Sequence, residues 1–208
     1  MDICENKLSI HNIPKKYLTN KTFSYKLYLN LCYISFWEYD VDINGNKFIE
    51  YKIRQYNLSE ISLMTGLSIN TIKNRLSKLP YRDKLDSEQL LNGELMDNFK
   101  FRRKKHLYFN SPRSNYIKID LNTLNKLLEL EEFDIRLYIF IYGYIYDTIR
   151  GLTQNSILEM IGFSSKSHNN FTKLTNSTNK LKKLGLLDFK VESDGIKKYI
   201  IYYKNKIN

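Results

Sequence analysis

The sequence predicts a mainly helical α+β fold with small β-hairpins, organised as two related units along the chain. Three observations lead to this expectation: an internal repeat, glycines between short amphipathic helices, and β-rich stretches joined by turn residues. The 208 residues leave room for two domains of about 100 residues each. A hydrophobic share of 42% is enough to build packed cores.

Two landmarks recur in the same order and define the repeat. Residues 61–68 align with 157–164 and share Ile, Met, Gly and Ser, at an offset of 96 residues. Upstream, residues 23–29 align with 133–139 at an offset of 110 residues. The difference between the two offsets means that the first copy contains additional residues between the landmarks. We expect these residues to form an inserted hairpin at about 41–56, with its turn at Asn44-Gly45.

Each copy begins with a long apolar helix, predicted over about 22–39 and 133–148. A short helix follows in both copies, opened by a polar cap. The predicted caps are Ser59 in the first copy and Asn155 or Ser156 in the second.

Gly66 and Gly162 follow the short helices, where a tight turn needs a residue that tolerates positive φ. A further helix then begins at Ser68 or Asn70 in the first copy and within Ser164–Ser167 in the second. Short helix, glycine turn and second helix form the helix-turn-helix pattern. A helical hairpin inside a bundle uses the same residues and is the alternative.

The end of each copy is rich in β-forming residues. In the second copy, residues 186–192 and 197–203 flank an Asp194-Gly195 turn, which predicts a hairpin. In the first copy, residues 99–109 are expected to pair with a return strand at 116–119. A Pro/Ser-bearing break at 111–114 sets the predicted domains as 1–112 and 113–208. Because each copy contains a helix-turn-helix followed by a hairpin, the sequence predicts two winged helices in tandem.

The second helix of each pair is the candidate DNA reader. In the first copy, Ile69, Ile72, Leu76 and Leu79 form the predicted buried stripe. In the second copy the inward residues are Phe171, Leu174, Thr178 and Leu181. The outer faces carry polar and basic residues without an acid, and they supply these candidate DNA contacts: Asn70, Thr71, Lys73, Asn74, Arg75, Ser77 and Lys78, then Ser165, Lys166, His168, Asn169, Thr172, Lys173, Asn176 and Lys180. A solvated helix face is the alternative for both.

The charge balance favours a polyanionic partner. Lys and Arg number 33 against 22 Asp and Glu, which gives a net charge of +11. Residues 100–113 hold no acid and concentrate the charge, so a first wing could contact phosphates through Arg102, Arg103, Lys104 and Lys105. Lys197 and Lys198 are the equivalent candidates on the second hairpin. Drift towards Lys and Asn in an AT-rich genome, or a solvated basic loop, is the alternative.

No residue pattern points to catalysis or to a cofactor. The sequence holds no phosphate-binding glycine loop, no GxSxG, no HExxH and no cysteine quartet, so we expect no enzyme activity, no cofactor and no metal site. Cys32 is expected in the core. The N-terminus has no signal-peptide pattern, and the longest apolar run, 137–146, is too short to span a bilayer, so we expect a cytoplasmic protein.

Two predicted winged helices on a chain of this size resemble the replication initiators of bacterial plasmids and phages. The resemblance lies in the architecture and covers most of the chain. It implies binding to double-stranded DNA at origin repeats, no bound nucleotide, and a host replication protein such as a helicase or primase as partner. A transcriptional regulator bound to an operator, a partition or conjugation protein, and a winged-helix protein–protein scaffold are the alternatives. A monomer and a homodimer both remain open.

Overall fold

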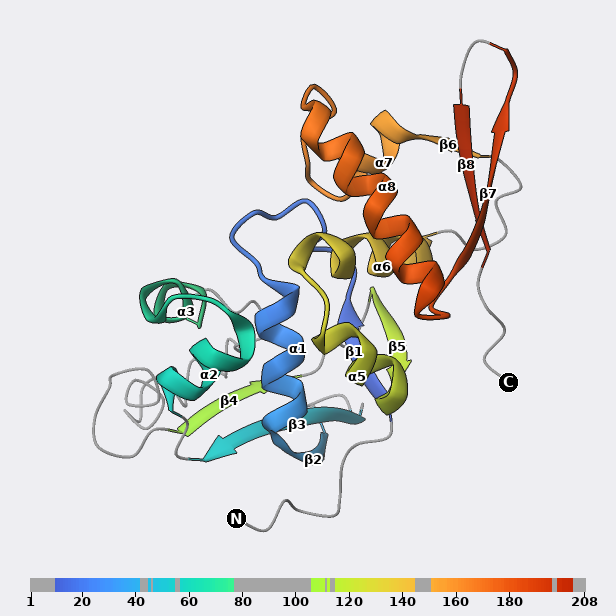
Figure 1. The fold of residues 1–208 in the computed structure, drawn as a ribbon. Coiled ribbons are helices and arrows are strands. Elements are labelled where there is room, and N and C mark those ends of the chain that lie inside the picture. The colour runs from blue at the N-terminus through green and yellow to red at the C-terminus, as the bar shows by residue number, and fades with distance from the viewer. Residues whose placement is uncertain are drawn as a thin grey trace.

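The computed structural model describes residues 10–41, 45, 47–54, 57–76, 106–110, 112, 115–144, 151–195 and 198–203. Over these residues the chain is a mixed α+β protein, as predicted. The described strands form two three-stranded antiparallel sheets, in the orders β2-β3-β4 and β6-β8-β7, and one antiparallel pair, β1-β5. Figure 1 shows the two three-stranded sheets at opposite ends of the molecule, with α1 and α6 between them.

The first unit contains the long helix and the inserted hairpin. Its elements are α1 (Tyr25–Ile34), β2 (Phe36–Val41), β3 (Lys47–Arg54), α2 (Leu58–Thr65), α3 (Ile69–Leu76) and β4 (His106–Asn110). The hairpin turns at Gly45, whose φ of +79° requires glycine. Helix α1 ends well before the predicted residue 39, because Ser35 is extended and an aromatic, β-forming run follows it.

The second unit has a clear order of elements. They are α6 (Glu132–Tyr144), β6 (Leu152–Thr153), α7 (Gln154–Met160), α8 (His168–Lys183), β7 (Asp188–Ser193) and β8 (Lys198–Tyr203). The predicted hairpin is confirmed, since β7 pairs with β8 on either side of Gly195, which has φ +87°. Gly66 and Gly162 both have positive φ, at +68° and +83°, as the predicted turns require.

The predicted caps of the short helices are wrong by two or three residues. Asn57 caps α2, and its side chain accepts the Ser59 N–H at 2.9 Å, so Ser59 lies inside the helix. Thr153 caps α7 and accepts the Ser156 N–H at 3.3 Å, so Asn155 and Ser156 lie within the first turn. In both units an earlier Asn or Thr satisfies the first free N–H groups.

The predicted return strand of the first wing is also wrong. Strand β5 (Tyr116–Asp120) exists, but it pairs with β1 (Ile10–Pro14) and not with β4, which pairs with β3. The pairing sets Ile13 opposite Ile117, and both are buried in the core. Because burial of these two isoleucines is favourable, β5 pairs with β1 near the N-terminus and not with β4, the strand that precedes it in the sequence. A short helix that was not predicted, α5 (Leu121–Leu128), follows, capped by Asp120.

One hydrophobic core extends through both units. It includes Leu27 and Leu31 of α1, Leu127 of α5, Ile139 of α6 and Leu181 of α8, all buried. Cys32 is buried in the same core, as predicted, and burial raises the pKa of its thiol. None of the helices among the described residues is long and apolar enough to cross a membrane.

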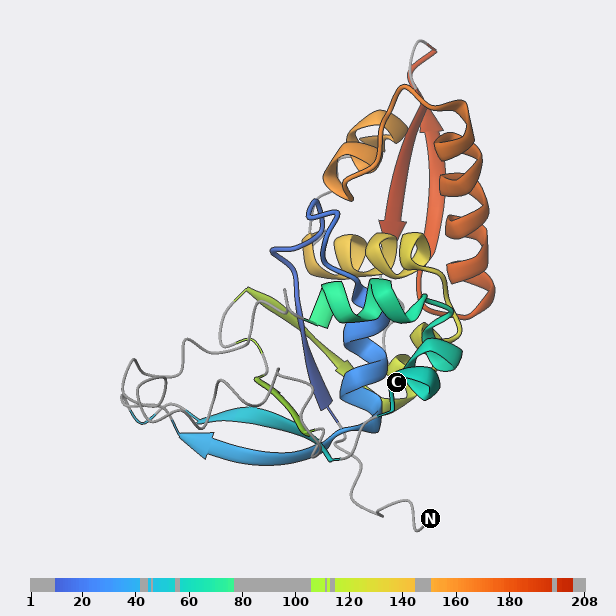
Figure 2. The same cartoon turned by 90° about the vertical axis from the view of Figure 1, so that its left-hand side faces the viewer.

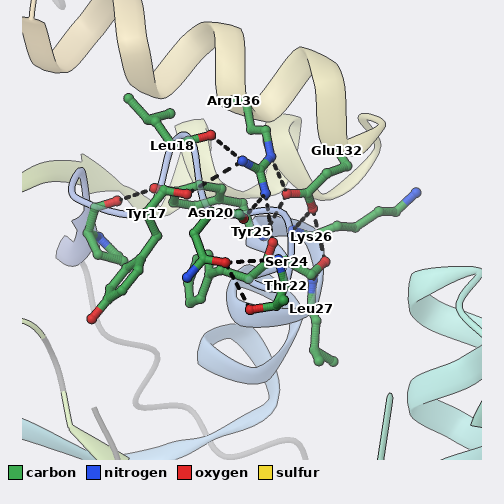
Figure 3. A network of polar contacts seen from close by, with 12 residues as sticks. Tyr17, Leu18, Asn20, Thr22, Ser24, Tyr25, Lys26, Leu27, Glu132 and Arg136 are labelled. Atoms are coloured by element: carbon green, nitrogen blue, oxygen red, sulfur yellow. Dashed lines mark hydrogen bonds and ion pairs between the residues drawn. The ribbon is translucent and has the colours of Figure 1, made fainter. Parts of the chain in front are cut away.

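Glu132, at the start of α6, caps the N-terminus of α1 (Figure 3). Its carboxylate accepts the backbone N–H groups of Tyr25 at 3.1 Å and Lys26 at 3.0 Å, and the Ser24 hydroxyl at 2.9 Å. The Ser24 oxygen in turn accepts the Leu27 N–H at 3.2 Å. An acid from the second unit therefore supplies the charge that the first turn of α1 lacks.

Arg136 completes this connection one turn further along α6. Its Nε donates to Glu132 at 2.8 Å, and its two terminal nitrogens donate to backbone carbonyls of the loop 17–23: Tyr17, Leu18, Asn20 and Phe23. The guanidinium lies over the Tyr25 ring, with its carbon 5.4 Å from the ring centre. Arg136 is buried, so its charge is compensated almost entirely by these groups (Figure 3).

The loop 17–23 also supports the turn between α7 and α8. A Cβ added at Gly162 would lie 2.9 Å from the backbone Cα of Thr19 and 3.0 Å from the Leu18 oxygen. Next to it, the Phe163 ring packs on Phe133 of α6, with centres 4.6 Å apart. The turn before α8 is therefore held by backbone from the first unit.

We expect Arg136→Leu to lower the free energy of unfolding by about 3–5 kcal/mol, because Glu132 and four carbonyls lose their donor in a buried place. Urea unfolding followed by circular dichroism measures this loss. The control is Glu131→Gln, which removes the pair with Lys26 from a side chain that is 76% exposed. That change should cost no more than about 1 kcal/mol. Equal stability of the Arg136 variant and the parent chain would contradict the role assigned to the pair.

Gly162→Ala and Gly66→Ala form a matched pair of substitutions. Both force alanine into a left-handed conformation, at a cost of about 1–2 kcal/mol, but a Cβ at Gly66 meets nothing within 4 Å. We expect Gly162→Ala to cost about 1–3 kcal/mol more, because it must also push away the Thr19 backbone. Thermal and urea unfolding of the two variants compare these costs, and equal losses would argue against the contact with the loop.

Candidate nucleic-acid interface

Helix α8 presents the most complete candidate surface. Its inner side packs into the core through Leu174, Thr178 and Leu181, as predicted, while Phe171 is only half-buried. Ser177 joins the buried side and was not predicted there. Because α8 contacts α6, α7 and β7 through this side, the opposite face is left to solvent.

The exposed face of α8 carries most of the predicted contact residues. His168, Asn169, Thr172, Lys173, Asn176 and Lys180 are all exposed. Asn179 and Lys183 lie on the same face and were missed, although counting the 3.6-residue period past Asn176 finds both. No acid occurs between Ser164 and Lys183 in the sequence. The face combines amide groups with positive charge, which suits both base edges and phosphates.

The turn before α8 holds two more predicted residues in different surroundings. Lys166 is exposed. Ser165 is half-buried, and its hydroxyl donates to the Glu159 carboxylate at 2.8 Å. Glu159 is exposed on α7, so the edge of the surface includes one acid that lies outside the acid-free stretch.

Several ion pairs and hydrogen bonds fix the position of α8. Lys180 Nζ lies 2.9 Å from the Asp134 carboxylate of α6, and Lys126 Nζ donates to the Leu184 carbonyl beyond the end of α8 at 2.9 Å. Lys182 pairs with Asp188 of β7 at 2.5 Å, and this pair lowers the pKa of the Asp188 carboxyl. Lys180 thus already has an acidic partner, and the other lysines of the exposed face are better placed for phosphates.

The part of the second hairpin whose side chains the structure describes carries more acids than bases. Lys197 lies outside the described residues, and β8 begins at Lys198, whose side chain is also outside them. Within β7, Lys190 pairs with Glu192, which raises the pKa of Lys190. The Tyr199 hydroxyl donates to Asp194 at 3.0 Å, and this bond raises the pKa of Tyr199. The described part of this hairpin therefore offers phosphates little net positive charge.

Helix α3 is the shorter candidate reader. Ile72 and Leu76 are buried as predicted, but Ile69 is 38% exposed, so its predicted place in the buried stripe is wrong. It is the first residue of α3 and follows the capping residue Ser68. The predicted residues Leu79, Ser77 and Lys78 lie outside the described residues.

The polar residues of α3 divide into exposed and half-buried positions. Asn70, Lys73 and Asn74 are exposed, whereas Thr71 and Arg75 are half-buried. Thr71 takes part in the cap, since its N–H donates to Ser68 at 3.2 Å and the two hydroxyls are 2.8 Å apart. Arg102 to Lys105 lie outside the described residues, and the basic segment leads into β4 at His106.

The two candidate readers lie in different parts of the molecule. In Figure 1, α3 lies on the first unit and α8 on the second, with α1 and α6 between them. Figures 1 and 2 both show the β7–β8 hairpin extending past the end of α8. The α8 face and the hairpin therefore form one end of the molecule, and α3 lies apart from them.

Comparison with family models, curated proteins and solved structures finds no match to this chain. Among the residues that the structure describes, no group of three or more His, Cys, Asp and Glu side chains is placed to hold a metal ion. His11 is buried with its Nδ1 3.2 Å from the Tyr51 hydroxyl, and His168 is exposed on α8.

Proposed function

We propose that this protein binds double-stranded DNA through two winged-helix units in tandem. The observation that carries the proposal is the order of elements and strands in the second unit. Its order is helix, strand, helix, helix, strand, strand, and its sheet order is β6-β8-β7. A helix-turn-helix followed by a hairpin that returns beside the first strand is the winged-helix arrangement. Here its second helix, α8, has an exposed face free of acids.

The first unit supports the same assignment through its strand pairing. Strand β3 precedes the helix pair α2–α3 and lies antiparallel to β4, just as β6 precedes α7–α8 and lies antiparallel to β8. Strand β2, joined to β3 by the inserted hairpin, adds the third strand of this sheet on the other side of β3. The units thus share the helix pair and one strand pair, which is consistent with duplication.

In this proposal α8 enters a major groove, and the amides of its exposed face meet base edges. Lys166 and Lys173 lie beside that face and contact phosphates. Helix α3 and the basic segment that includes Arg102 and Lys105 contact a second stretch of the duplex. Neither catalysis nor a cofactor is part of this function.

The resemblance to plasmid and phage replication initiators makes origin binding in the cytoplasm, with host replication proteins as partners, the first role that we propose. A transcriptional regulator would use the same surfaces.

One observation favours a scaffold role for the first unit. Leu63 and Met64 on α2 are 87% and 38% exposed, and Ile69 adds a third exposed apolar side chain. Such a group is suited to contact with another protein.

Selection of DNA fragments by the purified full chain tests the proposal. Fragments of the source genome and its plasmids are incubated with the protein, recovered and sequenced. Enrichment of tandem repeats near the gene of this protein is expected for an initiator, and a single palindrome for a regulator. Recovery no better than for random DNA would refute DNA reading and favour the scaffold.

The salt dependence of binding tests the basic segment. Replacing Arg102, Arg103, Lys104 and Lys105 with alanine should reduce the slope of log affinity against log salt by about 0.9 for each phosphate that the variant no longer neutralises. Fluorescence anisotropy with a selected duplex measures the slope. Lys21→Ala, an exposed lysine in the loop 17–23, is the control and should leave the slope unchanged. An unchanged slope in the fourfold variant would remove the first wing from the interface.

A further inference from the structure

Three uncharged residues occupy the middle of the exposed face of α8. Asn169, Thr172 and Asn176 are spaced by three and four residues, so they follow one another along one side of the helix. All three are exposed, and the buried side formed by Leu174 and Leu181 lies opposite. They therefore face any groove that admits the middle of this helix, while Asn179 and Lys183 continue the same face towards its C-terminal end.

Asn169, Thr172 and Asn176 make no side-chain hydrogen bond to any part of the chain that the structure describes. Their neighbours differ: Asn170 donates to the Ser164 carbonyl at 2.9 Å, and Thr175 donates to the Phe171 carbonyl at 3.2 Å. Asn169 and Asn176 thus keep complete amide groups, each with a donor and an acceptor, available for an external partner, and Asn179 adds a third nearer the end of the helix.

The residue types limit what this face can read. Helix α8 contains no arginine, and bidentate contact from arginine is the commonest way to recognise guanine. Asparagine instead pairs with adenine, donating to N7 and accepting from the N6 amino group, and a threonine methyl can contact the thymine methyl. Lys173 lies at the margin, and Lys180 pairs with Asp134, so neither occupies the centre of the face.

We propose that α8 reads A·T base pairs in the major groove. Asn169 and Asn176 each pair with the N6 and N7 edge of an adenine, and the Thr172 methyl contacts a thymine. The two asparagines are two helical turns apart, about 10 Å, so the two adenines are about three base pairs apart. This inference rests on the proposed DNA binding and specifies which duplex the second unit prefers.

Base analogues test the proposal without any protein variant. Three duplexes share one mixed order of A·T pairs: the parent, a copy with every A·T replaced by inosine·C, and a copy with 7-deazaadenine for adenine. Inosine·C keeps the minor-groove pattern of A·T but presents the major-groove pattern of G·C, while 7-deazaadenine removes only N7. We expect about tenfold to hundredfold weaker binding to inosine·C and a smaller loss with 7-deazaadenine.

A pair of protein variants assigns the preference to the two asparagines. The double variant Asn169→Ala, Asn176→Ala should bind the A·T and inosine·C duplexes alike. Asn170→Ala is the matched control, because it is the same substitution on a residue whose amide donates to the Ser164 carbonyl. It should keep the preference. Thermal unfolding of each variant confirms that it is folded before affinities are compared.

The outcomes separate this inference from the function on which it rests. Equal binding of the parent chain to the A·T and inosine·C duplexes overturns major-groove reading of adenine while leaving DNA binding intact. A preference for A·T that survives in the double variant also overturns it, since another element then carries the preference. Failure to bind any of the duplexes, or the selected genomic fragments, refutes the proposed function itself.

Discussion

The pair formed by the buried Arg136 and the half-buried Glu132 is the constraint on which the rest of the structure depends. Both lie at the start of α6, one helical turn apart, and between them stands Asp134. Glu132 caps α1, Arg136 holds the carbonyls of the loop 17–23, and Asp134 pairs with Lys180 of α8. One helix end thus positions the first helix of one unit and the candidate reading helix of the other. A buried arginine without these partners would be strongly unfavourable, so the loop must follow the path that α6 dictates.

Because of these contacts, the two units are not independent domains. Domains joined by a polar linker move independently, because few contacts cross between them. Here the loop 17–23 is fixed by Arg136 and supports Gly162, the strand pair β1–β5 joins the N-terminal segment to residues beyond the break at 111–114, and the core is continuous. The two candidate reading helices, α3 and α8, are therefore held at a fixed distance from each other. Such an arrangement favours DNA sites whose two halves have a fixed separation over sites with variable spacing.

Local signals in the sequence predicted local structure well. Gly66 and Gly162 were found because a turn between helices needs positive φ, and Asp194-Gly195 because hairpin turns need it too. The β1–β5 pair was missed because nothing near Tyr116 identifies a partner about 100 residues away, and hydrophobic alternation alone does not choose between strands. The role of Arg136 was also hidden. Arg136 directly precedes the apolar run 137–146, and only the path of the loop reveals its carbonyl partners.

The repeat explains why the units are similar, and the exposed residues explain why they need not act alike. At the offset of 96 residues, Leu63 of α2 corresponds to Glu159 of α7, and Ile69 of α3 corresponds to Ser165. The first unit exposes the apolar member of each pair, while in the second unit the polar members bond to each other at 2.8 Å. Water solvates the second surface at little cost, whereas the first retains apolar area that a contact could bury. This difference fits the proposed function, in which α8 reads bases and the first unit combines phosphate contacts with contacts to another protein.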